Sequence, residues 1–341
     1  MNRYMDGVVG NQKIRQKLCS DIFADKLPHA MILEGAFGTG KHTIAMNVAA
    51  ALACSNKKNG KIPCYACPQC KKIFDGNSPD IITFGCEGKT TFSVDSVRHI
   101  KDDIRTVPND LDFKLYIIED TDKMTPQAQN AFLLTLEEPP SFVRFILLCE
   151  NAELLLETIR SRAPVLRTEP IENSSLDEFL CRTDRRAAQM KLSSPREYEE
   201  LIIASKNGIG TALNYLEPKN FAPVKDIRTL ATDFCNIATS SQNAKNILLL
   251  LNRFSQKREV LLKQLVSLSE AITDLLLLKK SDDPVLAFFA DKNYAIELCD
   301  RVSMSFLFTL NNSVLEGIDK IQKNANVRLT LLKIVLDANI M

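Results

Sequence analysis

The chain has 341 residues, of which 45% are hydrophobic and 25% charged, the balance of an ordinary soluble globular protein. Lys and Arg number 43 against 42 Asp and Glu, so the formal net charge is +1. This near-neutral charge excludes a molecule that binds nucleic acid through overall positive charge, although a local basic face stays open.

The N-terminus carries no signal pattern, and no apolar run in the sequence is long enough to span a membrane. We therefore expect a cytoplasmic protein, and the length predicts two or three domains. The chain contains 10 Cys. In the reducing cytoplasm such thiols are metal ligands or buried side chains rather than disulfides.

Residues 1–168 alternate short apolar runs with helical patterns, which is typical of α/β domains. The clearest runs are Met31–Leu33, Leu115–Ile118 and Phe145–Leu148. Continuous apolar runs of this length are typical of parallel strands that are covered on both faces. The pattern predicts a doubly wound parallel sheet with ligand-binding residues at the carboxyl ends of its strands.

A glycine-rich loop, GAFGTGKHT, runs from Gly35 to Thr43 after the first apolar run. Its spacing is typical of a loop whose backbone N–H groups surround phosphate while a lysine reaches the terminal phosphates. The candidate nucleotide-binding residues are Gly35, Gly38, Thr39, Gly40, Lys41, His42 and Thr43. The alternative is a glycine turn that binds no nucleotide.

The loop departs from the usual pattern at His42, because a Ser or Thr normally follows the lysine and holds Mg²⁺. Imidazole is a poor ligand for this hard ion, which prefers oxygen. Thr43 stands one position too late and is expected to point elsewhere. We therefore expect any ATP or ADP at this loop to be bound weakly or without hydrolysis.

Four cysteines follow the loop within one segment, residues 54–70. Cys64, Cys67 and Cys70 are separated by two residues each, and Cys54 is the natural fourth ligand. Four thiolates form a closed tetrahedral zinc site with no open position for catalysis. The segment predicts a structural zinc module, and the alternative is a set of buried thiols.

Glu119 and Asp120 follow the second apolar run. A magnesium-dependent NTPase places an Asp at such a strand end, usually followed by a Glu that activates water. Here the order is inverted, so each carboxylate differs by one methylene from the usual residue and is expected to place its oxygens wrongly. The alternative is a strand end with solvated acids.

The remainder of the chain is predicted to be helical. Residues 169–222 are polar, with helix breaks at Asn207–Gly208 and at Pro218. Residues 223–341 contain an amphipathic stripe at three- and four-residue steps, formed by Leu261, Leu265, Leu268, Ile272 and Leu275. We expect all-α structure in both segments.

These features together resemble a known family. From about residue 5 to 168 the chain is similar to the AAA+ domain of bacterial DNA polymerase III clamp-loader subunits, including the glycine loop and the four-cysteine insertion. Further matching segments are VVGN at 8–11, LPHA at 27–30, NSPD at 77–80, NAFLLTLEEPP at 130–140 and IRSR at 159–162. The resemblance implies an AAA+ P-loop domain at 1–168, an all-α lid at 169–222 and an all-α collar at 223–341.

Two kinds of subunit share this architecture: the gamma/tau ATPase, and the delta prime subunit, which usually does not hydrolyse ATP. The departures favour delta prime, since His42 replaces the magnesium ligand, the acid pair is inverted, and Thr211 stands where the ATPase carries a sensor arginine. An active gamma/tau-type ATPase is the alternative. A zinc-knuckle DNA-binding module with a vestigial loop is a second alternative, which the near-neutral charge disfavours.

The family carries a Ser-Arg-Cys motif, which reads Ser161-Arg162-Ala163 here, so the cysteine is replaced but the arginine is retained. By resemblance, Arg162 acts in trans on ATP bound to the neighbouring ATPase subunit, where a guanidinium neutralises charge that develops on the transferred phosphate. A surface or capping arginine is the alternative. The resemblance further implies a hetero-pentamer with gamma/tau and delta subunits that loads the sliding clamp onto primed DNA, without polymerase chemistry in this chain.

Overall fold

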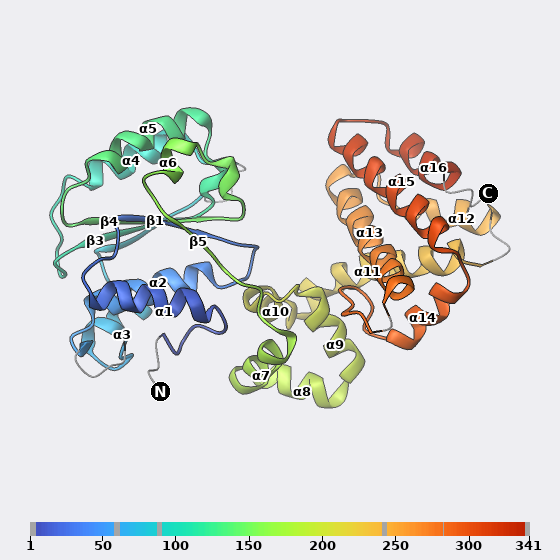
Figure 1. The fold of residues 1–341 in the computed structure, drawn as a ribbon, viewed down its shortest axis with the longest axis horizontal. Helices are drawn as coiled ribbons and strands as arrows, with labels where there is room; N and C mark the ends of the chain where they lie inside the picture. Colours follow the sequence, from blue (N-terminus) through green and yellow to red (C-terminus); the bar gives the residue numbers. More distant parts are fainter. Residues whose placement is uncertain (1–4, 58–61, 87–90, 241–243, 282, 338–341) are drawn as a thin grey trace. The chain divides into compact units, whose positions relative to one another are not determined.

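The computed structural model describes residues 5–57, 62–86, 91–240, 244–281 and 283–337. The chain forms two compact units (Figure 1). The first contains the chain up to Phe179 together with Asn207–Gly210, and the second contains Leu180–Lys206 and the residues from Thr211 onward. The division into three domains at 168 and 222 stays a prediction, and helix α11 (Pro218–Ala238) continues through position 222.

The first unit is built on a parallel sheet of five strands in the order β2-β3-β4-β1-β5. The strands are β1 (Ala30–Glu34), β2 (Ile81–Phe84), β3 (Lys114–Ile118), β4 (Val143–Cys149) and β5 (Val165–Arg167). The three predicted apolar runs lie in β1, β3 and β4, the central strands. The predicted doubly wound α/β sheet is therefore confirmed, with the glycine loop directly after β1.

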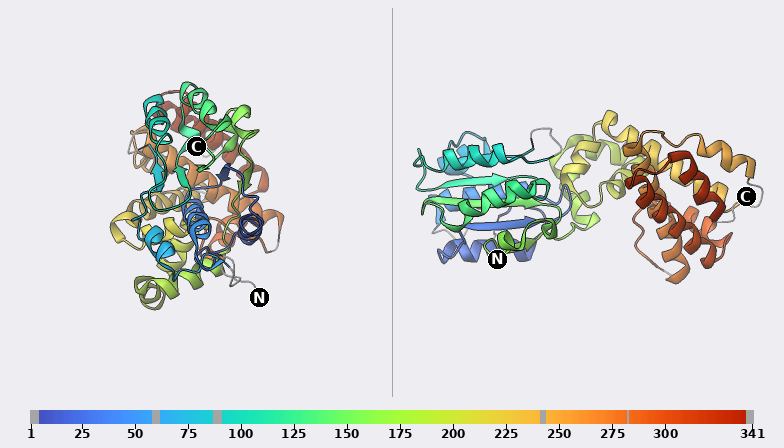
Figure 2. Two further views of the ribbon diagram at one scale, coloured as in Figure 1. Left: turned by 90° about the vertical axis from the view of Figure 1, so that its left-hand side faces the viewer. Right: turned by 90° about the horizontal axis from the view of Figure 1, so that it is seen from above.

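Helices cover both faces of this sheet (Figures 1 and 2). One face carries α1 (Gln12–Phe23), α2 (Lys41–Ala53) and α3 (Pro68–Phe74), and the other carries α4 (Val94–Asp103), α5 (Pro126–Glu137) and α6 (Glu157–Arg160). Successive strand residues enter opposite cores: Met31 and Leu33 pack with the first set of helices, whereas Ala30 and Ile32 pack with the second. Burial on both faces explains why these strands are continuously apolar.

In the second unit, the regular elements among the described residues are all helices. Helix α7 (Asn173–Thr183) leads into it, followed by α8 (Arg185–Ser193), α9 (Pro195–Ala204), α10 (Ile209–Tyr215), α11, α12 (Ala244–Leu251), α13 (Arg258–Lys280), α14 (Lys292–Asp300), α15 (Met304–Gln322) and α16 (Val327–Asp337). The predicted leucine stripe lies on α13, and its members are at most 1% exposed. They form the core against α11 and α15, as the periodicity predicts. Within the described residues, we find no helix both long and apolar enough to cross a lipid bilayer.

Asp80 joins the start of β2 to the segment that leads into β3. It is fully buried, and its carboxylate accepts the backbone N–H groups of Asn109, Asp110 and Leu111 at 2.7, 2.7 and 2.9 Å. Burial raises the pKa of this carboxyl group, but the three N–H donors outweigh burial and hold the pKa below its ordinary value. The carboxylate therefore fixes the path of the chain into β3.

We expect Asp80→Asn to lower the free energy of unfolding by about 2 kcal/mol at pH 7, because an amide cannot accept all three N–H groups. The folded pKa lies below the unfolded value of about 3.9, so the carboxylate's contribution is full above that pH and is lost as the pH falls through the folded pKa. Urea unfolding between pH 7 and pH 3 should therefore show the two proteins converging at acid pH. The exposed Asp75 provides the control variant Asp75→Asn, and equal stability of both variants would contradict this role.

Candidate nucleotide site and metal centre

The glycine loop connects β1 to α2 in a conformation that requires glycine. Gly38 and Gly40 have φ values of 81° and 88°, in the left-handed region. A Cβ atom at Gly35 would lie 1.8 Å from Oγ1 of Thr168, so this position excludes a side chain. Because Gly40 is the N-cap of α2, the loop leads directly into a helix N-terminus, which favours anions.

The ammonium group of Lys41 is held by the carbonyl groups of this loop. Its Nζ atom donates to the carbonyl oxygens of Gly35 and Ala36, the latter at 2.9 Å. Thr39 closes the loop, since its Oγ1 donates to the same Ala36 carbonyl at 2.8 Å. Burial lowers the pKa of Lys41, and nearby acids, Glu150 foremost, oppose this effect. The loop therefore combines a cation with a helix N-terminus, the two features that bind phosphate.

The two departures from an ATPase site contact each other. The imidazole Nδ1 of His42 lies 2.8 Å from Oε1 of Glu119, at hydrogen-bonding distance. Asp120 pairs instead with Lys123 at 2.7 Å. Thr43 is exposed, and its carbonyl accepts a hydrogen bond from Asn47. The first acid after β3 is thus engaged by the residue that replaces the usual magnesium ligand.

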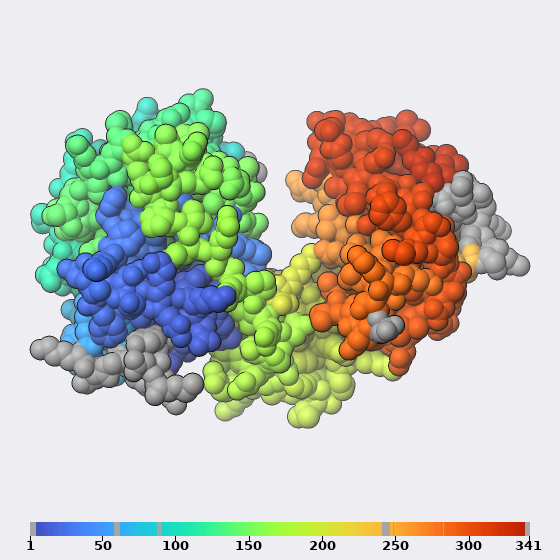
Figure 3. Space-filling view, viewed as in Figure 1, coloured from blue at the N-terminus to red at the C-terminus, as the bar shows by residue number. Residues whose placement is uncertain are grey.

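A segment at the start of the chain lies against the glycine loop. We call residues 5–11 the N-terminal strap. Asn11 is buried, its Nδ2 donates to the carbonyl of Thr39 at 3.4 Å, and its Oδ1 accepts the N–H of Glu169 at 2.7 Å. Figure 3 shows the blue N-terminal residues beside the green residues that follow β5 on the surface of the first unit. The strap therefore joins the glycine loop to the chain after β5.

The segment Asn207–Gly210 also returns to the glycine loop. A Cβ atom on Gly210 would lie 3.9 Å from the Cα atom of Gly38. Thr211, the residue predicted to occupy the position of a sensor arginine, follows this segment directly. The start of α10 therefore lies close to the loop that would bind phosphate.

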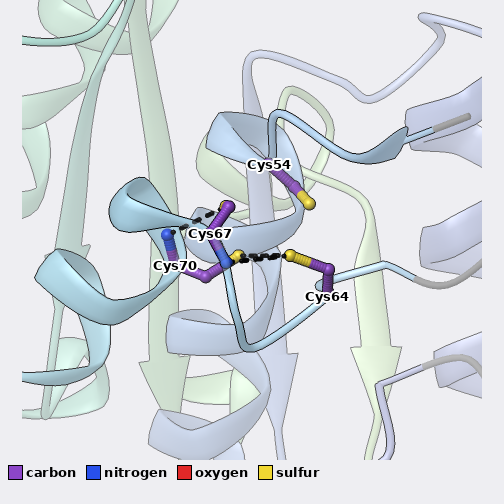
Figure 4. A group of neighbouring side chains, drawn as sticks. All are labelled: Cys54, Cys64, Cys67 and Cys70. Carbon is purple, nitrogen blue, oxygen red and sulfur yellow. Dashed lines mark hydrogen bonds between the residues drawn. The ribbon is translucent and has the colours of Figure 1, made fainter.

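The four cysteines predicted to bind zinc converge on one point (Figure 4). The Sγ atoms of Cys54, Cys64, Cys67 and Cys70 all lie within 4.8 Å of one another, and those of Cys64 and Cys70 are 3.9 Å apart. A tetrahedral zinc ion with Zn–S bonds of about 2.3 Å separates its sulfur ligands by about 3.8 Å. The cluster therefore fits zinc, although residues 58–61 of the predicted module lie outside the described residues.

Backbone N–H groups stabilise the thiolates that a metal requires. The N–H of Cys67 donates to Sγ of Cys64 at 3.3 Å, and that of Cys70 donates to Sγ of Cys67 at 3.5 Å. Burial raises the pKa of the Cys64 thiol, but N–H donors from Ala66 and Cys67 outweigh it and lower the pKa to about 6. Since Cys54 caps α2 and Cys67 caps α3, a bound metal would cross-link these two helices.

Arg162 lies directly after α6 and contacts the end of α5. Its Nη2 pairs with Oε1 of Glu137 at 2.7 Å, and its Nη1 donates to the carbonyl of Thr158 at 2.9 Å. The side chain is 36% exposed. These contacts tie Arg162 to the TLEEPP segment rather than to the glycine loop, so the two predicted sites of this chain stay separate.

Asp122 is a site residue that the motifs do not reveal. It lies in the short helix η2 (Thr121–Lys123), and its Oδ2 accepts the N–H groups of Glu150 at 2.9 Å and Asn151 at 3.2 Å. It thereby joins the carboxyl ends of β3 and β4. The sequence offers one signal for it, its place two residues after the inverted acid pair.

Comparisons with known proteins find similar sequences among bacterial DNA polymerase III subunits. A family model described as DNA polymerase III, delta subunit, matches residues 10–172. DNA polymerase III subunit gamma of Buchnera aphidicola subsp. Acyrthosiphon pisum is 27% identical over 281 residues, which cover 82% of this chain and 72% of that protein. DNA polymerase III subunit delta' of Bacillus subtilis is 31% identical over 172 residues, 50% of this chain and 51% of that protein, so the chain spans about half of its length. A solved gamma subunit-related structure from Thermotoga maritima, covering 95% of this chain and 98% of its own, has 19% identity and a TM-score of 0.48.

The parallel sheet, its strand order, the glycine loop after β1 and the acids after β3 define a P-loop domain of the AAA+ class. Together with the sequence matches over residues 10–172 and the similarity to gamma and delta' subunits, they support a protein of the bacterial clamp-loader AAA+ type. Its relatives carry both gamma and delta' names, so the choice between these two types rests on the chemistry of the site.

Proposed function

We propose that the chain is a delta-prime-type subunit of the DNA polymerase III clamp loader. It assembles with gamma/tau and delta subunits in a hetero-pentamer, in the cytoplasm, and the complex uses ATP to load the sliding clamp onto primed DNA. The contact between His42 and Glu119 at 2.8 Å carries this proposal, because it occupies the two positions that an active site uses for magnesium.

The glycine loop supports retention of nucleotide without turnover. The ammonium group of Lys41 lies at the loop, and the N-terminus of α2 favours anions, which together support phosphate binding whatever residue follows the lysine. Hydrolysis needs more, because a metal must bridge the β- and γ-phosphates and a carboxylate must position water. Here His42 offers nitrogen instead of oxygen, and Glu119 already pairs with it. ATP or ADP at this site therefore acts as a bound ligand rather than as a substrate.

Arg162 is the residue that this subunit contributes to catalysis elsewhere. It lies between α6 and β5, and its side chain is 36% exposed, so part of it is accessible to a neighbouring subunit. In the assembled complex it reaches ATP bound to the neighbouring ATPase subunit and neutralises charge on the transferred phosphate.

The purified chain should hydrolyse no ATP above the protein-free background, whereas a mixture with the gamma/tau and delta subunits should turn over ATP. The physical reason is the absence of an oxygen ligand at position 42. Steady-state phosphate release, measured with and without the partners, tests this. Turnover by the chain alone that Lys41→Ala abolishes would refute the proposal and favour a gamma/tau-type ATPase.

A further inference from the structure

Tyr65 lies between two metal ligands, Cys64 and Cys67, and its hydroxyl group contacts two other parts of the first unit. The hydroxyl oxygen accepts the N–H of Gly7 in the N-terminal strap at 2.8 Å, and the hydroxyl donates to Oδ1 of Asn47 in α2 at 2.5 Å. One phenol oxygen thus connects the cysteine module, the strap and the helix that begins at Lys41.

Residues of the cysteine module and of α3 hold the Tyr65 side chain in position. Its ring stacks on Phe74 of α3 with the ring centroids 5.2 Å apart. Its backbone has a φ of 56°, in the left-handed region that residues other than glycine rarely adopt, and cysteine ligands flank it on both sides. Gly7 fits closely against it, since a Cβ there would lie 3.1 Å from the hydroxyl oxygen.

One route from Tyr65 to the glycine loop passes through α2. Asn47 is 1% exposed, so its amide needs hydrogen-bonding partners inside the protein. Its Oδ1 accepts from Tyr65, and its Nδ2 donates to the carbonyl of Thr43 at 2.8 Å. Thr43 belongs to the first turn of α2, two residues after Lys41.

A second route passes along the strap. Met5 is fully buried, and its N–H donates to the carbonyl of Ile62 in the module at 3.1 Å. Gly7 follows with its contact to Tyr65, and Asn11 ends the strap on the carbonyl of Thr39. The strap is therefore attached to the module at one end and to the glycine loop at the other.

We propose that the metal-loaded cysteine module holds the N-terminal strap on the glycine loop through the hydroxyl group of Tyr65. A bound metal fixes the backbone between Cys64 and Cys67, and Tyr65 transmits this order to Gly7 and Asn47. Loss of the metal releases the strap and with it one wall of the candidate nucleotide site. This coupling lies within the first unit and does not depend on the clamp-loader role.

The test is hydrogen exchange of the strap amides in the full chain carrying Tyr65→Phe, followed by mass spectrometry. The variant keeps the ring and its stacking but removes the oxygen, so strap exchange should accelerate by about 3- to 10-fold, the effect of one lost hydrogen bond. Zinc content should stay at that of the unmodified chain. Tyr294→Phe, which removes the same atom from α14 in the other unit, should leave strap exchange unchanged.

Metal removal with a chelator completes a double-perturbation cycle. Chelation should accelerate strap exchange in the unmodified chain and should add much less in Tyr65→Phe, because that contact is already absent. The inference would be overturned if Tyr65→Phe left the exchange rate of the strap amides unchanged. It would also be overturned if chelation accelerated that exchange equally in both proteins. If chelation unfolds the whole unit, the comparison of the two metal-loaded proteins decides alone.

Discussion

If Arg162 acts in trans as proposed, Arg162→Ala should slow ATP hydrolysis at the neighbouring site of the reconstituted clamp loader by about 10³- to 10⁵-fold. The Arg162 side chain is 36% exposed and pairs with Glu137, an exposed residue. Exposed ion pairs contribute about 1 kcal/mol or less, so Arg162 can exchange this partner for a phosphate at small cost, and its removal should leave the fold intact.

Two further variants define what this result would mean. Arg162→Lys keeps the positive charge but loses the planar fork of donors. A complex that contains this variant should therefore also hydrolyse ATP slowly. Arg105→Ala removes an exposed arginine from the same unit and should hydrolyse normally. Single-turnover hydrolysis and light scattering measure rate and assembly separately. A wild-type rate in a complex containing Arg162→Ala would show that the arginine has no role in trans.

Replacing Cys70 with Ser should remove zinc from the chain and destabilise the first unit. Cys70 is fully buried, its Sγ lies 3.9 Å from that of Cys64, and its loss leaves three thiolates for a tetrahedral ion. Structural zinc contributes directly to folding free energy. A loss of about 3 kcal/mol would lower the melting temperature of a unit of this size by about 6–12 °C.

Metal analysis and calorimetry of the full chain check this prediction together. The unmodified protein should contain about one zinc per chain, and Cys70→Ser should contain almost none. Cys181→Ser is the matched control, because Cys181 lies outside the cluster and a serine can keep its contact with Tyr198. The site would be refuted if the unmodified protein contained no metal and Cys70→Ser melted at the same temperature as the unmodified protein.

The central part of the fold follows from local sequence, and its edges do not. β1, β3 and β4 are buried on both faces, so their apolar runs reveal them directly. β2 and β5 have partly exposed residues, and each pairs with a single neighbour. Such short edge strands bury too little apolar surface to leave a clear pattern, and their positions depend on the strands they pair with.

Some residues of the candidate site can likewise be predicted from the sequence, whereas others can be identified only in the folded chain. The cysteine spacing alone predicts the thiol cluster, because three of its members lie within one short turn of chain. The contact between His42 and Glu119 joins residues 77 positions apart, and only the folded sheet brings them together. Asp80, Asp122 and Tyr65 act through backbone groups or through a single oxygen, and such contacts leave no spacing rule in a sequence.

The first unit is not continuous along the chain, because Asn207–Gly210 belongs to it while the stretches on both sides belong to the second unit. A fragment that ends at Phe179 would therefore lack Gly210, which lies close to Gly38, and a test of nucleotide binding on that fragment would not represent the whole protein. Protease cleavage between residues 180 and 206 would likewise leave a downstream piece that still carries four residues of the upstream unit. Any dissection of this protein into separately expressed parts has to treat that tetrapeptide as part of the glycine-loop unit.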